Sequence, residues 1–487
     1  MHEPSYIREE RSGRLSFGTK LFQGFGAIPD TVKNWVFNTF ALLFYNQVLG
    51  VDALLVSVAL AVAMVFDAVT DPLVASLSDN LRSRWGRRHP LMLIAALPLG
   101  ACLFAVFVPP QGLGSLSLFA WLLTFTVLTR GFMTLYFVPW AAIAAELSDD
   151  YDERTLIMIF RYAVGWTIGV SLPLFVYTFL MPGTEEQPVG QLNPEGYPAM
   201  AALAGLLLTG GALATTLLTW REIPYLRRHA GETPGFSLAQ TGRELLRALQ
   251  NRQFLLIFIA VLLMSAIGGT TANINIYMTT FFWGLTTEDL RWFALSATGA
   301  VVAFPIVAGL QTRWDKKSIL LTSGILSLLD GLFLVSLRFL DVLPANGDPM
   351  LLVILVGMGV ITAGLAVVLG VTASSIVADL LDDHELRTGY RQEAMFSAAL
   401  SFSGKAISGL GTIFGGLIIT GIAFPVGVAP AEVPDNAILR LGVAVGVLVP
   451  LFYLAPIALV TRYRITRERH AEIRAALQAR RPLQEED

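Results

Sequence analysis

The stretch FDAVTDPLVASLSDNLRSRWGRRHP, residues 66–90, decides the fold class, because it joins a long apolar run to a strongly basic loop. Its first half carries Asp67 and Asp71, and a spacing of four residues places both carboxylates on one face of a helix. Ionisable side chains are costly inside a bilayer, so they are usually reserved for ions, protons or polar solutes. The stretch therefore predicts a membrane-spanning helix that carries functional acids and ends at the membrane surface.

The composition is that of an integral membrane protein. Of the 487 residues, 54% are hydrophobic and 15% charged, and the mean hydropathy is +0.62, whereas a soluble domain is about a quarter charged. Cys102 is the single cysteine and the five histidines fall in tails or connecting segments, which disfavours an intrachain disulfide and a buried metal centre. The polar N-terminal segment also predicts that no signal peptide is removed.

Apolar runs long enough to cross about 30 Å of hydrocarbon, at about 20 residues each, occur twelve times. We therefore expect an all-α integral membrane protein with twelve transmembrane helices. The expected spans are residues 21–47, 52–79, 89–110, 115–147, 153–182, 197–219, 253–283, 289–312, 317–340, 349–379, 394–424 and 437–461.

The basic residues predict the orientation. The segments on the side of the two termini hold 27 lysines and arginines, and the opposite segments hold only Arg291, Arg338 and Arg440. Basic residues are enriched in cytoplasmic loops, so both termini are expected in the cytoplasm and the protein in the plasma (inner) membrane.

The longest polar insertion divides the chain into two halves of six spans. We expect an N-terminal six-helix bundle (1–220), a central cytoplasmic loop (221–252), a C-terminal six-helix bundle (253–462) and a charged cytoplasmic tail (463–487). Leucines at 238, 245, 246 and 249 predict an amphipathic surface helix within the loop.

The two halves share an exit signature. The second span of the first half leaves through RWGRR (84–88), and the second span of the second half leaves through RWDKK (313–317). The shared order suggests parallel pseudo-repeats. The alternative is that any cytoplasmic loop attracts basic residues.

The acids at 67 and 71 suit a cation. Two carboxylates one turn apart, with the hydroxyl of Thr70 beside them, provide oxygen donors for Na⁺ or for a shared proton. The alternative is a structural ion pair with Lys405 or with an arginine. Lys405 lies among small residues in SFSGKAISGLG (401–411), and either competes with the cation or is a static partner.

Other intramembrane polar residues are candidates for solute binding. Asp30 and Arg161 could bind solute hydroxyls or pair with each other, and Lys33 could bind solute or snorkel to the surface. An aromatic pair, Tyr136 and Trp140, could stack on a sugar ring or simply pack in the core. Asn273 follows a glycine pair that interrupts its helix.

Two further intramembrane charges are harder to place. Arg130 is expected to reach the outer surface. Asp330 has no obvious partner, and a structural role is expected for it.

Several motifs together resemble one family. GFGAIPD (24–30), DAVTDP (67–72), SRWGRRHP (83–90), VPW (138–140) and DHELRTGYRQEAMF (383–396) occur in the order found in the glycoside-pentoside-hexuronide:cation symporters of the major facilitator superfamily. The resemblance implies twelve helices, alternating access, and a sugar site coupled to Na⁺, Li⁺ or H⁺.

The resemblance also implies residue roles. Asp67 and Asp71 match the cation-site acids, Lys405 the adjacent lysine, and Asp30 and Arg161 the sugar-site pair. The sequence departs from the family at two places, with Thr70 where the family has asparagine and Phe137 where it has a helix-four aspartate. Because these oxygen ligands are lost, coupling to a proton is expected as readily as coupling to Na⁺.

We therefore expect a cation-coupled transporter of a small polar solute, namely a glycoside, pentoside or hexuronide. The residues expected to switch conformation lie in the loop after the second span: Asp79, Arg84, Gly86, Arg87 and Arg88. No cofactor or nucleic acid is expected beyond the coupling ion, and the protein is expected to be a monomer. The alternatives are a lysolipid transporter of the same fold, a channel, and a membrane-embedded enzyme or receptor, for which no catalytic constellation is present.

Overall fold

The computed structural model describes residues 13–185, 187–226, 252–388, 393–464 and 466–480, together with two short strands, β1 (Tyr6–Ile7) and β2 (Arg228–His229). The strands pair antiparallel and are the described exception to a helical fold. The amphipathic helix predicted for the central loop lies outside the described residues.

Eleven described helices are long and apolar enough to cross a membrane. Their boundaries follow the predicted spans closely, because long apolar runs leave the backbone no other way to satisfy its hydrogen bonds in lipid. They are α3 (Ala53–Asn80), α4 (His89–Phe107), α5 (Ser115–Glu146), α6 (Tyr151–Phe175) with η3 (Val176–Leu180), α7 (Gly196–Leu218), α9 (Arg252–Tyr277) with η6 (Met278–Phe282), α10 (Thr287–Leu290) with η7 (Arg291–Ser296) and α11 (Ala297–Arg313), α12 (Lys316–Phe339), α13 (Pro349–Thr388), α14 (Glu393–Gly421), and α15 (Asp435–Val443) with η9 (Ala444–Leu448), α16 (Val449–Leu451) and α17 (Leu454–Thr461).

The first predicted span is a crossing built from four pieces. These are α1 (Phe17–Phe25), α2 (Ala27–Val36) and the π-helical turns η1 (Phe37–Ala41) and η2 (Phe44–Val48). The helix is interrupted at Gly26, where a Cβ atom would lie 1.9 Å from the indole Nε1 of Trp140. The absence of a side chain at Gly26 therefore lets Trp140 of α5 approach the backbone of the first span. Together with the eleven helices above, this crossing gives the twelve spans predicted from the sequence.

The first crossing of each half ends in the same way. After η2, the amide of Leu49 donates to Phe44 O (2.9 Å), and after η6 the amide of Trp283 donates to Met278 O (2.9 Å). Each turn is followed by a left-handed glycine, Gly50 (φ 78°) and Gly284 (φ 62°). This shared ending supports the two pseudo-repeats predicted from the sequence.

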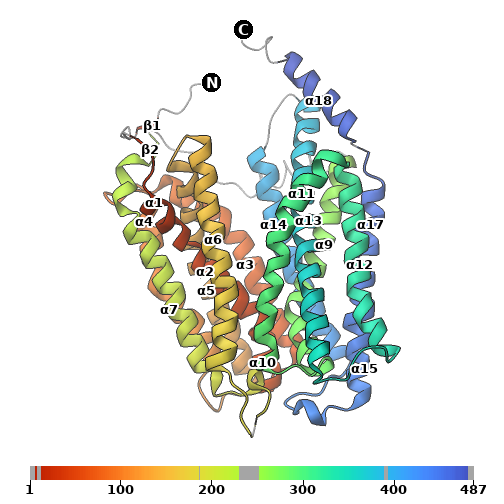
Figure 1. The fold of residues 1–487 in the computed structure, drawn as a ribbon. Helices are drawn as coiled ribbons and strands as arrows, with labels where there is room; N and C mark the ends of the chain where they lie inside the picture. Colours follow the sequence, from red (N-terminus) through yellow and green to blue (C-terminus); the bar gives the residue numbers. More distant parts are fainter. Residues whose placement is uncertain are drawn as a thin grey trace.

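Figure 1 shows two helical bundles side by side, α1–α7 and α9–α17, with both chain ends at the same end of the molecule. Polar contacts join the halves at the opposite end: Gln47 Nε2 donates to Pro425 O (3.1 Å), Gln191 Nε2 to Thr280 Oγ1 (3.1 Å) and Tyr277 OH to Asn46 Oδ1 (2.8 Å). The bundles are thus closed against each other away from the termini.

Part of the charged tail forms a docked helix, α18 (Arg467–Arg480). The guanidinium of Arg467 donates to Thr312 O (2.9 Å) and Gln311 O (2.6 Å), which satisfies carbonyl groups at the end of α11. Ile473 is buried against the C-terminal half. The tail is therefore attached to one bundle only within the described residues.

Candidate functional site

The two acids of α3 lie at the boundary between the halves. Lys405 of α14 donates to Asp67 Oδ2 (3.1 Å) and to Asp71 Oδ2, so one ammonium group contacts both carboxylates. Thr134 of α5 also bridges them, since its hydroxyl lies 2.8 Å from Asp67 Oδ1 and 3.1 Å from Asp71 Oδ1. This acid cluster ties the C-terminal half to the N-terminal half in the middle of the molecule.

The hydroxyl of Thr70 does not reach the acids. It donates to the backbone oxygens of Phe66 (3.0 Å) and Asp67 (3.2 Å), as threonine in a helix often does. The structure brings Thr134 of α5 to the place expected for Thr70, and spacing within α3 alone could not reveal this.

Arg130 belongs to the acid cluster, and the expectation that it reaches the outer surface is wrong. Its Nη1 lies 3.4 Å from Asp67 Oδ2, and its side chain is 13% exposed. Arg130 and Thr134 are four residues apart, so both project from one face of α5 towards α3. That spacing was the signal available in the sequence.

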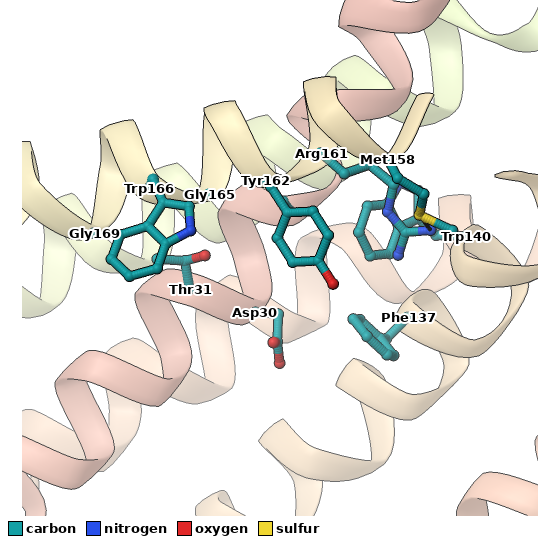
Figure 2. A pocket seen from close by; sticks show the side chains of 11 residues that line it. Asp30, Thr31, Phe137, Trp140, Met158, Arg161, Tyr162, Gly165, Trp166 and Gly169 are labelled. Carbon is teal, nitrogen blue, oxygen red and sulfur yellow. Dashed lines mark hydrogen bonds between the residues drawn. The ribbon is translucent and has the colours of Figure 1, made fainter. Parts of the chain in front are cut away.

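A cavity of about 550 Å³ lies in the N-terminal half, between α2, α5 and α6. Figure 2 shows Arg161 beside Trp140, and Tyr162 extending from α6 towards Asp30. The Arg161 guanidinium stacks 3.7 Å from the centre of the Trp140 ring, which holds its donors at the cavity wall. Residues that spacing along α6 could have indicated, but that we did not predict, also line this cavity: Met158, Tyr162, Gly165, Trp166 and Gly169.

The cavity acid Asp30 is paired with Lys33 rather than with Arg161. Lys33 Nζ lies 3.1 Å from Asp30 Oδ1, and Asn34 Nδ2 lies 3.1 Å from Asp30 Oδ2. Lys33 is buried, so it does not snorkel to a surface.

Trp140 is fixed to the broken first crossing. Its indole Nε1 donates to Gln23 O (2.9 Å), and Gln23 Nε2 donates back to Trp140 O (2.9 Å). Tyr136 stacks nearly parallel to Trp140 and donates to Gly26 O (3.1 Å) from a fully buried position. Trp140 thus faces the cavity, whereas Tyr136 supports it from behind.

Asn273 lies outside the cavity. Its amide donates to Gly269 O (3.2 Å) and Thr412 Oγ1 (3.3 Å), so it joins α9 to α14. Asn275, two residues further along, lines a second cavity of about 240 Å³ between the halves, together with Trp35 and Thr39. Gly169 of α6 lines both cavities.

The basic loop after α3 forms a compact ionic network. Arg88 Nη2 lies 2.7 Å from Asp79 Oδ1 and 2.7 Å from Glu146 Oε1, and Arg87 Nη2 lies 2.7 Å from the same Glu146 oxygen. Gly86 adopts a left-handed conformation (φ 77°) that turns the chain into this network. Glu146, at the end of α5, was not predicted.

The remaining predicted charges lie elsewhere. Arg84 contacts the ring of Trp85 (5.1 Å) at the exposed edge of the loop. Asp330 of α12 accepts a hydrogen bond from Thr362 of α13 (2.7 Å), so it has a partner, and it does not line either cavity. Neither residue joins the acid cluster.

Comparison with known proteins identifies the family. A family model described as "MFS/sugar transport protein" matches residues 22–467, so the chain belongs to this family of major facilitator transporters and is not an enzyme. An uncharacterized symporter, sll1374 of Synechocystis sp., is 27% identical over 96% of this chain and 97% of its own length.

Two relatives with named solutes are also similar. The lactose permease of Leuconostoc lactis is 24% identical over 88% of this chain and 64% of its own length. The sodium-dependent lysophosphatidylcholine symporter 1-A of Danio rerio is 29% identical over 34% of this chain and 31% of its own length. Among solved structures, the nucleoside transporter NupG superposes with a TM-score of 0.61 at 13% identity, over 92% of this chain and 100% of its own, which shows a common fold.

Proposed function

We propose that the protein is a cation-coupled symporter of a small polar solute, namely a glycoside, pentoside or hexuronide. The observation that carries this proposal is the acid cluster at the boundary between the halves, where Lys405 of α14 contacts both Asp67 and Asp71 of α3. Cation binding at these acids and a change in the arrangement of the two halves around a solute would both act on this one contact. Such a shared contact makes the two binding free energies interdependent, as symport requires.

The acid cluster supports coupling to the movement of the halves. Lys405 is the group from the C-terminal half that holds Asp67 and Asp71. A cation that neutralises these acids would compete with Lys405 and release this contact between the halves. The coupling ion, Na⁺ or H⁺, would thus favour the rearrangement between states that alternating access needs.

The first cavity supports a sugar-like solute. Asp30, Thr31 and Arg161 offer hydrogen-bond acceptors and donors, and the rings of Trp140, Tyr162 and Trp166 offer flat apolar faces. Sugar rings present hydroxyl groups at their edges and C–H groups on their faces, so they fit both kinds of wall. The family description and the similarity to a lactose permease agree with this class.

We further propose a monomer in the plasma (inner) membrane with cytoplasmic termini, which rests on the distribution of basic residues. With that orientation the structure is closed towards the outside, because the polar contacts between the halves lie at the end opposite the termini. The first cavity would then face the cytoplasm. This is the state expected after solute has been released inward.

The test is uptake by the purified protein in proteoliposomes. Labelled methyl β-glucoside, methyl β-xyloside and methyl β-glucuronide are offered with inward Na⁺ and proton gradients, and D67N is compared with the wild type. We expect D67N to lose accumulation against a gradient but to keep exchange of solute across the membrane. D330N is the matched control, since it removes an intramembrane carboxylate that lines neither cavity. Uphill accumulation by D67N would refute the role of Asp67.

The rival solute is a lysolipid, which the similarity to the zebrafish symporter favours. The same proteoliposomes are therefore tested with labelled lysophosphatidylcholine. Accumulation of this lipid with no uptake of any glycoside would replace the sugar by an amphipathic solute.

A further inference from the structure

Arg130 gives the acid cluster a cation of its own. Its guanidinium contacts Asp67 at 3.4 Å, and its Nε is buried without a hydrogen-bond partner among the described residues. Together with Lys405, which contacts Asp67 and Asp71, it brings two basic groups to two carboxylates. In this conformation the cluster is electrically balanced by residues of the chain itself.

The two basic groups differ in the half from which they come. Arg130 lies on α5, which packs along α3 and its two acids within the N-terminal bundle. Lys405 lies on α14 in the other bundle, and its side chain is 37% exposed. Relative movement of the bundles can separate Lys405 from the acids, whereas Arg130 moves with them. Arg130 is therefore a permanent part of the cluster.

The oxygen atoms at the cluster suit a metal ion poorly. Hard cations are bound by several oxygen ligands at once. Besides the carboxylates, Thr134 brings one hydroxyl to the acids, whereas Thr70 directs its hydroxyl to backbone oxygens and Phe137 on α5 has no oxygen in its side chain. The carboxylate oxygens themselves are already engaged by Lys405 and Arg130. A metal ion between the acids would also lie close to the Arg130 guanidinium, and like charges repel strongly away from bulk water.

We infer that Arg130 determines ion specificity, because it occupies the cluster as a resident cation and excludes Na⁺ from Asp67 and Asp71. The inference rests on the proposed function and deepens it, because a cluster that excludes Na⁺ has the proton as its coupling ion. Replacing Arg130 by a neutral side chain removes the repulsion and one of the two compensating charges. The variant cluster, with two acids and Lys405, then carries a net negative charge that attracts Na⁺.

The first test uses Na⁺ itself as the probe and needs no solute. The melting temperature of the purified full chain is measured in rising NaCl against choline chloride of equal ionic strength, for the wild type, R130Q and R130K. We expect no saturable Na⁺ effect for the wild type or R130K. For R130Q we expect a saturable rise of about 2 °C or more at about 100 mM Na⁺, because a ligand that binds the folded state stabilises it.

Two results would overturn the inference. One is a saturable Na⁺ shift in the wild type, a measurement that does not depend on any variant being folded. The other is an R130Q protein that responds to Na⁺ no more than the wild type does.

The second test separates this inference from the proposed function. Wild-type proteoliposomes receive labelled methyl glycosides under a Na⁺ gradient at equal pH, and then under a proton gradient without Na⁺. Accumulation driven by protons alone supports the exclusion of Na⁺. Accumulation driven by Na⁺ overturns it and leaves the symport intact. If neither gradient drives any solute, the proposed function fails, and the melting experiment still decides whether Arg130 excludes Na⁺.

Discussion

A single methyl group at Gly26 should disrupt the solute cavity. The Cβ atom of G26A would lie 1.9 Å from Trp140 Nε1 and 2.3 Å from Cε2, and a rigid indole cannot yield without leaving its place. Displacement breaks the hydrogen bond from Trp140 to Gln23 O and removes the surface on which Arg161 stacks. The single substitution G26A should therefore disturb both the packing of the first crossing and the wall of the cavity.

The magnitude follows from these contacts. Overpacking a tight site costs about 1–3 kcal/mol, and the lost indole hydrogen bond adds about 1 kcal/mol. We expect G26A to lower the free energy of unfolding by about 3 kcal/mol and the melting temperature by roughly 3–6 °C. Solute binding should weaken as well, because Arg161 no longer has its aromatic support.

The assay compares G26A with G210A, a matched glycine-to-alanine change. A Cβ atom at Gly210 meets nothing within 4 Å, and alanine favours the helix by about 1 kcal/mol. G210A should therefore melt at or slightly above the wild-type temperature. If G26A melts together with G210A and binds solute equally well, the proposed fixing of Trp140 by the break at Gly26 is refuted.

Three further predictions concern charged contacts. R88M should lower the free energy of unfolding by about 1.5–3 kcal/mol, since Glu146, whose side chain is 8% exposed, loses its hydrogen bonds from Arg88 but keeps Arg87 as a partner; a variant as stable as the wild type would contradict this. K405M should cost only about 1–2 kcal/mol in a chemical denaturation experiment, because the buried Asp67 keeps Arg130 as a partner and Asp71 is partly exposed, and it should abolish accumulation of solute. T134V should lower stability by about 1.5–3 kcal/mol, since the hydroxyl whose single proton lies between the two carboxylates is lost, and T134S should restore it; equal melting curves for T134V and the wild type would count against the bridging role.

Most of the membrane-spanning helices could be predicted to within a few residues, because the length and apolarity of each run are local properties, although α13 (Pro349–Thr388) continues nine residues beyond its predicted span of 349–379. The predicted span 52–79 is α3, Ala53–Asn80, and the predicted span 115–147 is α5, Ser115–Glu146. A break in the first span could be expected from the glycines and Pro29 of GFGAIPD (24–30), but the close approach of Trp140 to Gly26 could not, since the two positions are more than a hundred residues apart. Apolarity decides that a segment crosses, but contacts between helices decide its internal shape.

The acids of the candidate site could be found because charge is conspicuous in an apolar run. Their partners were harder to assign, since a rotation about the helix axis decides which side chains meet. Arg130 was expected at the outer surface and contacts Asp67 instead. Asn273 and Asn275 share one segment, yet only Asn275 lines a cavity. The depth of a residue along its helix can be counted from the sequence, but the neighbour that its side chain faces depends on how the surrounding helices pack.

The place of Arg130 in the same half as the acids has a consequence for synthesis. Asp71 and Lys405 are separated by 334 positions, and a ribosome needs roughly 17–67 s to add them at about 5–20 residues per second. During that interval α3 and α5 can already be inserted while α14 does not yet exist. Arg130 and Thr134 are then the groups in the described structure that can partner Asp67 inside the lipid. A nascent chain with this arrangement never has to carry both acids uncompensated while it waits for its second half.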